Sequence, residues 1–169
     1  MKKKVLSILV DNSSGVLSRV AGLFSRRGYN IDSLTVGETE NPIYSRMTVV
    51  AKGDDQILDQ IKKQLEKLED VREVIELTDG HSVTRELVLI TVGVAPDKRN
   101  EITSLAEIFR ANIVDVELDS VMVELTGNQR KINAFIELLE NYEIKELVRT
   151  GIAGLSRGGE GISEKFMDD

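Results

Sequence analysis

The chain has 169 residues, 41% hydrophobic and 30% charged, a length and a balance that fit one large or two small globular domains and exclude a disordered chain. Its formal net charge of −7 argues against a nucleic-acid-binding protein, since that affinity comes largely from Lys and Arg on phosphates. The absence of cysteine excludes disulfides, thiolate metal sites and cysteine nucleophiles, and favours a reducing, cytoplasmic location.

The chain begins with Met-Lys-Lys-Lys, but the apolar stretch that follows, at 5–10, is too short for an export signal. Residues 4–10 are rich in Val, Leu and Ile and predict a strand, which the turn-forming residues 11–15 interrupt. A helix is then expected as far as Gly28, because apolar residues recur at the spacing of one buried stripe. The stripe consists of Val16, Leu17, Val20, Leu23 and Phe24.

A hairpin follows the first helix, with β-rich strands at 30–36 and 44–51 and a turn at 37–42. A second amphipathic helix has charged residues on its opposite face. Its apolar stripe is Ile57, Leu58, Ile61, Leu65 and Leu68. Residues 71–77 then predict a fourth strand.

The same order of elements repeats after a polar stretch at 78–82. A strand at 86–94 leads to a helical stripe, and Asn112 opens a hairpin much as Asn30 opens the first. The two helical stripes of this half are Ile102, Leu105, Ala106 and Phe109, and Ile132, Phe135, Ile136 and Leu139. A last strand is expected at 144–150.

Two βαββαβ units of this kind predict an α+β protein with two ferredoxin-like folds, each an antiparallel four-stranded sheet with both helices on one face. We place the first domain at 1–78, a linker at 79–84, the second domain at 85–160 and a flexible tail at 161–169. The other face of each sheet should stay uncovered, so we expect dimerisation or packing between the units.

The start of the first helix is the most informative candidate site. A helix start offers unpaired N–H groups and a partial positive charge that favour a carboxylate or phosphate, and Gly15 has no side chain to obstruct it. Alternatively, Ser13 or Ser14 simply caps the helix, and spacing alone favours that interpretation. The corresponding connection in the second half, 95–100, has no glycine, so any ligand site should belong to the first unit.

Other polar residues predict little chemistry. His81 is the only histidine and lies in the expected linker, so no transition-metal site is predicted. Ser13, Ser14 and Ser18 have no histidine base nearby, which argues against a serine nucleophile. Asn30, at the start of the second strand, has an amide that both donates and accepts hydrogen bonds, although for this residue taken alone an ordinary turn asparagine is the better interpretation.

The sequence closely resembles acetolactate synthase small subunits over nearly its whole length. The longest matching run includes GVLSRVAGLFSRRGYNI, which begins at Gly15 and ends at Ile31. The segments that carry the resemblance are 9–37, 45–49, 85–87, 107–111, 149–151 and 154–158.

The resemblance implies that residues 1–78 form an ACT domain that pairs with the same domain of a second subunit. In this family valine or a related branched-chain amino acid is held between the paired domains, at the start of the first helix. The residues at the matching positions are Asn12, Gly15, Val16, Leu17 and Asn30. The chain would have no active site and would activate a separate catalytic subunit, which uses thiamine diphosphate, magnesium and FAD, and make it sensitive to feedback inhibition by valine.

Two other functions share this order of elements. An RNA-recognition module needs aromatic side chains on its central strands, but aromatics are 4% of the chain and Tyr44 is the one candidate in the first hairpin. A small acylphosphatase-like enzyme would use a phosphate-binding turn before the first helix, with Arg19 and Asn30 in the catalytic roles. Against this, Arg19 falls one turn inside the helix, where an arginine is more often solvated.

Overall fold

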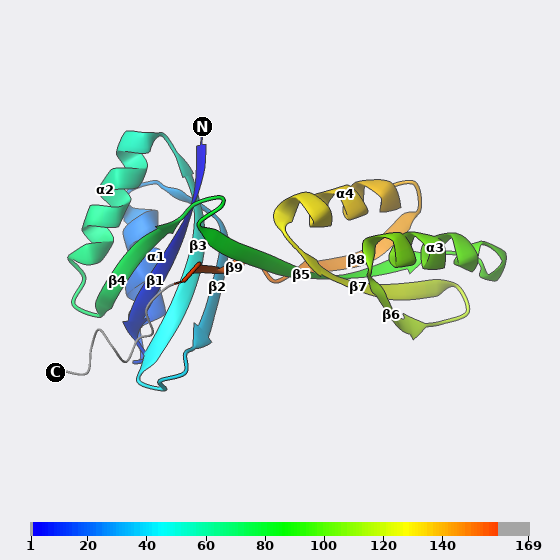
Figure 1. Ribbon diagram of the computed structural model, residues 1–169, viewed down its shortest axis with the longest axis horizontal. Helices are drawn as coiled ribbons and strands as arrows, with labels where there is room; N and C mark the ends of the chain where they lie inside the picture. Colours follow the sequence, from blue (N-terminus) through cyan, green and yellow to red (C-terminus); the bar gives the residue numbers. More distant parts are fainter. Residues whose placement is uncertain (1, 159–169) are drawn as a thin grey trace. The chain divides into compact units, whose positions relative to one another are not determined.

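The structure is a computed structural model that describes residues 2–158. It divides the chain into two compact units, one that runs to Val83 and includes the chain again from Ile152, and another that comprises Thr84–Gly151. Each unit contains an antiparallel sheet with both of its helices on one face (Figure 1). The α+β class and the two ferredoxin-like units expected from the sequence are thereby confirmed.

The first unit has the strand order β2-β3-β1-β4, and every neighbouring pair is antiparallel. Because β1 and β3 are the central strands, both faces of β1 are buried from Leu6 to Val10, which explains why this strand reads as a continuous apolar run. The elements are β1 (Lys2–Asp11), α1 (Val16–Arg26), β2 (Asn30–Glu38), β3 (Tyr44–Gly53), α2 (Asp55–Glu66) and β4 (Val71–Leu77).

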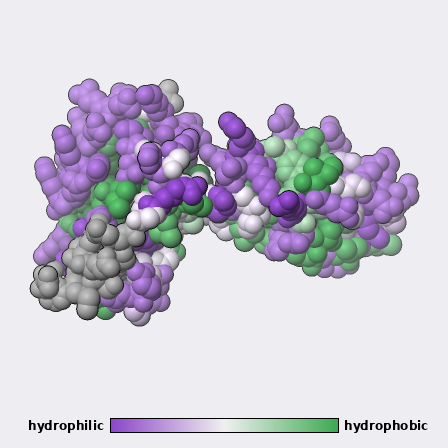
Figure 2. All heavy atoms as spheres, in the orientation of Figure 1, coloured by the Kyte–Doolittle hydropathy of each residue, from purple (hydrophilic) through white to green (hydrophobic). Residues whose placement is uncertain are grey.

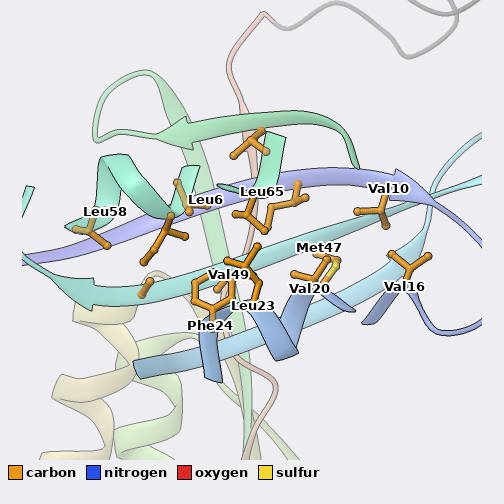
Figure 3. Close-up of a cluster of buried hydrophobic side chains, with 14 residues drawn as sticks. Leu6, Val10, Val16, Val20, Leu23, Phe24, Met47, Val49, Leu58 and Leu65 are labelled. Carbon is orange, nitrogen blue, oxygen red and sulfur yellow. The ribbon is translucent and has the colours of Figure 1, made fainter. Parts of the chain in front are cut away.

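The core of this unit lies between the sheet and its two helices (Figure 3). From α1 it takes Val20, Leu23 and Phe24, which follow the helical spacing seen in the sequence. From α2 it takes Leu58, Ile61 and Leu65, apolar residues that are three or four positions apart. The fully apolar contact between the two layers fixes the position of α1, and hence of its first turn, against the sheet.

The opposite face of this sheet is covered in part, contrary to the expectation from the sequence. Ser7 and Thr48 are on this face and are only 1% and 3% exposed. The chain returns here after the second unit, where the backbone N–H of Gly154 donates to Thr48 Oγ1 at 3.4 Å and Thr35 Oγ1 donates to the carbonyl of Ile152 at 3.1 Å. In Figure 1 the short strand β9 (Ala153–Ser156) crosses the sheet on the side away from α1.

The second unit repeats the plan with the strand order β6-β7-β5-β8, and β9 pairs with β5. Its core is again enclosed between sheet and helices, with the rings of Phe109 and Phe135 tilted against each other at 5.1 Å. The elements are β5 (Ser82–Gly93), a 3₁₀ turn (Pro96–Lys98), α3 (Arg99–Phe109), β6 (Asn112–Val116), β7 (Ser120–Gly127), α4 (Gln129–Leu139) and β8 (Glu143–Arg149).

The division of the chain differs from the expected domains at both junctions. Strand β5 begins at Ser82, inside the expected linker of 79–84, and residues 152–158 belong with the first unit rather than with 85–160. The expected tail at 161–169 lies outside the described residues. Figure 2 shows hydrophilic side chains over α2 and apolar groups at the surface of the second unit, where Ile108 and Leu118 are exposed.

Candidate functional site

The first turn of α1 has no side-chain cap. Gly15 occupies the N-cap position in the left-handed conformation, with φ 85°, and no acidic residue lies in the first turn. By contrast, Asp54 caps α2 and Asn128 caps α4, each side chain accepting a backbone N–H at 2.8 Å and 2.9 Å respectively. The interpretation of Ser13 or Ser14 as a helix cap is therefore wrong. The N–H groups at this helix start remain available to an acceptor from outside the helix.

Arg19 lies one helical turn after Gly15 and adds a positive charge beside the helix start. Its Nη1 is 3.0 Å from the position that a Cβ at residue 15 would occupy, and its Nε donates to Asp70 Oδ2 at 2.5 Å. Sequence reasoning treated Arg19 as a solvated arginine, although the i+4 spacing from Gly15 could have placed it here. Its pairing with Asp70 also speaks against the catalytic role that an acylphosphatase-like enzyme would require.

Asn12 is held against the turn between β2 and β3. Its backbone N–H donates to the carbonyl of Ile43 at 2.8 Å, and its side-chain Nδ2 donates to the carbonyl of Pro42 at 2.9 Å. The side-chain bond fixes the direction of the amide, while Oδ1 accepts no hydrogen bond from any residue of 2–158. Asn12 thus presents an oriented acceptor next to the start of α1.

Asn30 is at the other end of the same sheet. It is exposed at the start of β2, where its Nδ2 donates to Asp32 Oδ1 at 3.2 Å. The neighbouring residue of Asn12, Asp11, pairs with Tyr44 at the start of β3, whereas Asn30 pairs with Lys52 near the end of that strand. Eight residues of strand separate the two pairings, or about 26 Å. A single chain therefore does not bring Asn12 and Asn30 to one ligand.

Val16 and Leu17 make different contributions from adjacent positions. Val16 packs into the core with α1 (Figure 3), so that only its backbone can face a ligand. The side chain of Leu17 is exposed. Of the five residues expected at the site, the structure places Asn12, Gly15, Val16 and Leu17 at one helix start and Asn30 away from them.

Among residues 2–158, no three His, Asp or Glu side chains gather as metal ligands would. No helix in the same range is long and apolar enough to cross a membrane. Tyr44, the candidate for base stacking, is buried beside Leu9, which removes the platform that an RNA-recognition module would need.

Comparisons with known proteins agree over both halves. Residues 6–73 match the family described as "AHAS small subunit-like ACT domain", and residues 85–158 match "Small subunit of acetolactate synthase". The chain is 54% identical to a probable acetolactate synthase small subunit of Archaeoglobus fulgidus over 92% of this chain and 98% of that one. It is 46% identical to the small subunit of acetolactate synthase isozyme 3 of Escherichia coli, over 92% and 96% of the two chains.

A solved structure extends the likeness to three dimensions. The acetolactate synthase small subunit of Thermotoga maritima superposes with a TM-score of 0.85 at 42% identity. The match covers 95% of this chain and all of that one, so both units are included.

Proposed function

The chain belongs to the family of acetolactate synthase small subunits, and from this premise we propose that it is a valine-sensing regulatory subunit. It binds valine, or a related branched-chain amino acid, between the ACT domains of two copies. It activates a catalytic subunit and makes that subunit subject to feedback inhibition in branched-chain amino acid biosynthesis.

One observation carries the location of the effector site. Asn12 and Asn30 lie at opposite ends of β3, about 26 Å apart along the strand, so a ligand the size of valine cannot touch both within one chain. Two copies related by a twofold axis would bring Asn12 of one chain to Asn30 of the other, twice over. The separation supports an interfacial site and a dimer.

The chemistry of the helix start fits an amino acid. The uncapped N–H groups of α1 and the guanidinium of Arg19 suit the α-carboxylate. The oriented Oδ1 of Asn12 and an amide from Asn30 of the second copy would accept hydrogen bonds from the ammonium group. The exposed side chain of Leu17 offers an apolar contact for the isopropyl group.

The catalytic work belongs to the partner in this proposal. Thiamine diphosphate, magnesium and FAD would be bound by the catalytic subunit, and the chain described here would make no acetolactate from pyruvate when supplied with them alone. Feedback then equals a coupling free energy between the valine site and the partner contact, typically about 1 to 3 kcal/mol. Acetolactate formation by the chain alone would contradict this role.

Mixed dimers test the interfacial site directly. Asn12→Ala and Asn30→Ala chains, each with a different affinity tag, are purified separately and as a doubly tagged mixed dimer, and valine binding is measured by calorimetry. In each single-variant dimer both sites lack one amide, and affinity should fall about tenfold. In the mixed dimer one site lacks both amides and the other site is intact. Calorimetry should therefore show wild-type affinity at one of the two sites, which is half the number of sites in the wild-type dimer.

Asn112→Ala is the matched control, because Asn112 opens the hairpin of the second unit as Asn30 opens that of the first. It should leave valine binding unchanged. Mixed dimers with no high-affinity site would contradict a site shared between chains, and a monomer in sedimentation at micromolar concentration would contradict the dimer itself.

A further inference from the structure

A groove of about 440 Å³ lies on the first unit, on the sheet face opposite α1 and α2. It is lined by residues of β2, β3 and the returning segment with β9, together with Val83. Its volume is in the lower part of the range of about 300 to 1,000 Å³ that is usual for small-molecule sites. Its lining includes Thr35, Glu38, Arg46, Thr48, Val83 and Leu155.

The polar groups at the base of the groove already have partners. Thr35 Oγ1 donates to the carbonyl of Ile152, and Thr48 Oγ1 accepts from the N–H of Gly154. These two bonds hold the returning segment on the sheet and leave aliphatic side chains as walls. The groove is therefore a preformed, mainly apolar space whose lining includes two charged residues, Arg46 and Glu38. Arg46 pairs with Gly37 and Glu38 pairs with Ser45, so the two charged side chains leave the hairpin on opposite faces.

Arg46 differs in its partner from Arg19 and Arg149 and resembles Arg99, which is also partly buried and donates to the carbonyls of Glu117 and Leu118. Arg19 pairs with Asp70 and Arg149 pairs with Glu86, each through a charged hydrogen bond. Arg46 is half-buried, yet its Nη1 donates to the neutral hydroxyl of Ser7 at 2.9 Å, and no ion pair of residues 2–158 includes it. A partly desolvated cation gains most from an anion that enters the same low-dielectric space.

We propose that this groove is a second ligand site, which binds an organic carboxylate with a short, branched aliphatic body. Arg46 would pair with the carboxylate, and Val83 and Leu155 would enclose the apolar body. The site is separate from the valine site, because Arg46 faces away from α1, and it does not rest on the proposed function. A bound ligand would bridge β3 and the returning segment.

The test is an amide-resonance titration of the full chain with sodium 3-methylbutanoate, followed at Thr48 and Gly154. The uncharged isostere 3-methylbutanamide shows whether charge is recognised. Arg46→Met removes the cation, and Ala153→Trp fills the groove while leaving Arg46 and Ser7 intact, so that a loss of folding in the first variant does not decide the question. Arg130→Met, at an exposed position of α4, is the control.

Saturable shifts at both amides are expected, with affinity about tenfold lower in each groove variant and for the amide, and unchanged in the control. The shifts should persist in saturating valine. Absence of saturable shifts, equal binding of the amide, unchanged binding in the variants, or displacement by valine would each overturn the proposal. Separate titrations with leucine and with 4-methyl-2-oxopentanoate distinguish an amino acid from a 2-keto acid as the source of the carboxylate. Tighter binding of either compound than of 3-methylbutanoate would strengthen the proposal.

Discussion

Val16 and Leu17 are consecutive residues of α1, yet one side chain is buried and the other is exposed, with 3% and 47% of their surfaces accessible. Successive residues of an α-helix are about 100° apart, so the first turn places one in the core and the other over the helix start. Sequence reasoning assigned both to the effector site. In the structure Val16 packs in the core, and only Leu17 presents its side chain as a candidate contact for the effector.

Two alanine variants should therefore have opposite effects. Val16→Ala removes two buried methyl groups and should lower the free energy of unfolding by about 2 kcal/mol. Leu17→Ala should change stability by less than about 0.5 kcal/mol but weaken valine binding, because its contact is with the ligand. Urea denaturation and calorimetry measure the two quantities. Wild-type valine affinity in Leu17→Ala would remove this residue from the site.

The ion pair between Arg149 and Glu86 predicts a second stability effect. Glu86 has 4% of its side chain exposed, and its carboxylate accepts hydrogen bonds from Nε and Nη2 of Arg149, at 2.6 Å and 2.9 Å. The hydrogen bond with Glu86, with a smaller contribution from its charge, raises the pKa of Arg149 against the opposing effect of burial. Arg149→Met would leave a buried carboxylate without its cation.

Arg149→Met should lower the free energy of unfolding by about 2 to 3 kcal/mol. This loss is smaller than that expected for a fully buried pair, because Arg149 keeps 31% of its side chain exposed. Thermal unfolding measures it. Lys145→Met, on the same strand, is the control, since its pair with Asp119 at 3.6 Å is exposed and should contribute little. Equal losses in the two variants would show that burial does not distinguish these pairs.

Much of the fold could be predicted because the local patterns agree with the tertiary structure. The helical stripe from Val20 to Phe24 and the apolar run of β1 are what the core requires, so spacing alone located both. The return of the chain at Ile152 could not be found in this way. Its position depends on Thr35 and Thr48, which are more than 100 residues earlier and carry no local signal for the contact.

The candidate site was predicted less completely, for a geometric reason. Glycine and asparagine at the helix start marked an anion site, but spacing says nothing about which residues share one end of a sheet. Strand register does, and it separates Asn12 from Asn30. Arg19 was missed because a charged residue on an exposed helix face usually has no partner, whereas here Asp70 holds it beside Gly15.

Tyr142 predicts a pH effect in the second unit. Its hydroxyl donates to Glu101 Oε2 at 2.6 Å, and this bond, together with burial and the charge of Glu101, raises the pKa of Tyr142 from its ordinary value of 10.0. A phenol with a raised pKa in the folded state stabilises the protein below the unfolded pKa, and the contribution is lost as the pH rises through the folded one.

The phenolate absorbance should therefore contain a component that titrates above pH 10.0 and that Tyr142→Phe removes. The same variant should lose stability less steeply than wild type as the pH rises past that value. Tyr29→Phe is the control, since the hydroxyl of Tyr29 donates to an uncharged amide, that of Gln60, and the high-pH component should survive. Persistence of the component in Tyr142→Phe would contradict the assignment.

Gly15→Asp tests the effector site most sharply, with Gly15→Asn as its matched control. Both side chains must adopt φ 85°, which Asp and Asn tolerate better than other residues, and both approach the flexible end of Arg19. The backbone strain and the added bulk are therefore shared. The two variants differ in charge alone.

The aspartate carboxylate would stand where the carboxylate of valine approaches the uncapped helix start. Two like charges about 4 Å apart at an effective dielectric near 20 repel by about 4 kcal/mol, and half of that weakens binding about thirtyfold. Acetolactate formation by the reconstituted complex, measured against valine concentration, should show stimulation by both variants but inhibition that persists in Gly15→Asn and is lost in Gly15→Asp. An inhibition curve for Gly15→Asp that matches wild type would place the effector away from α1.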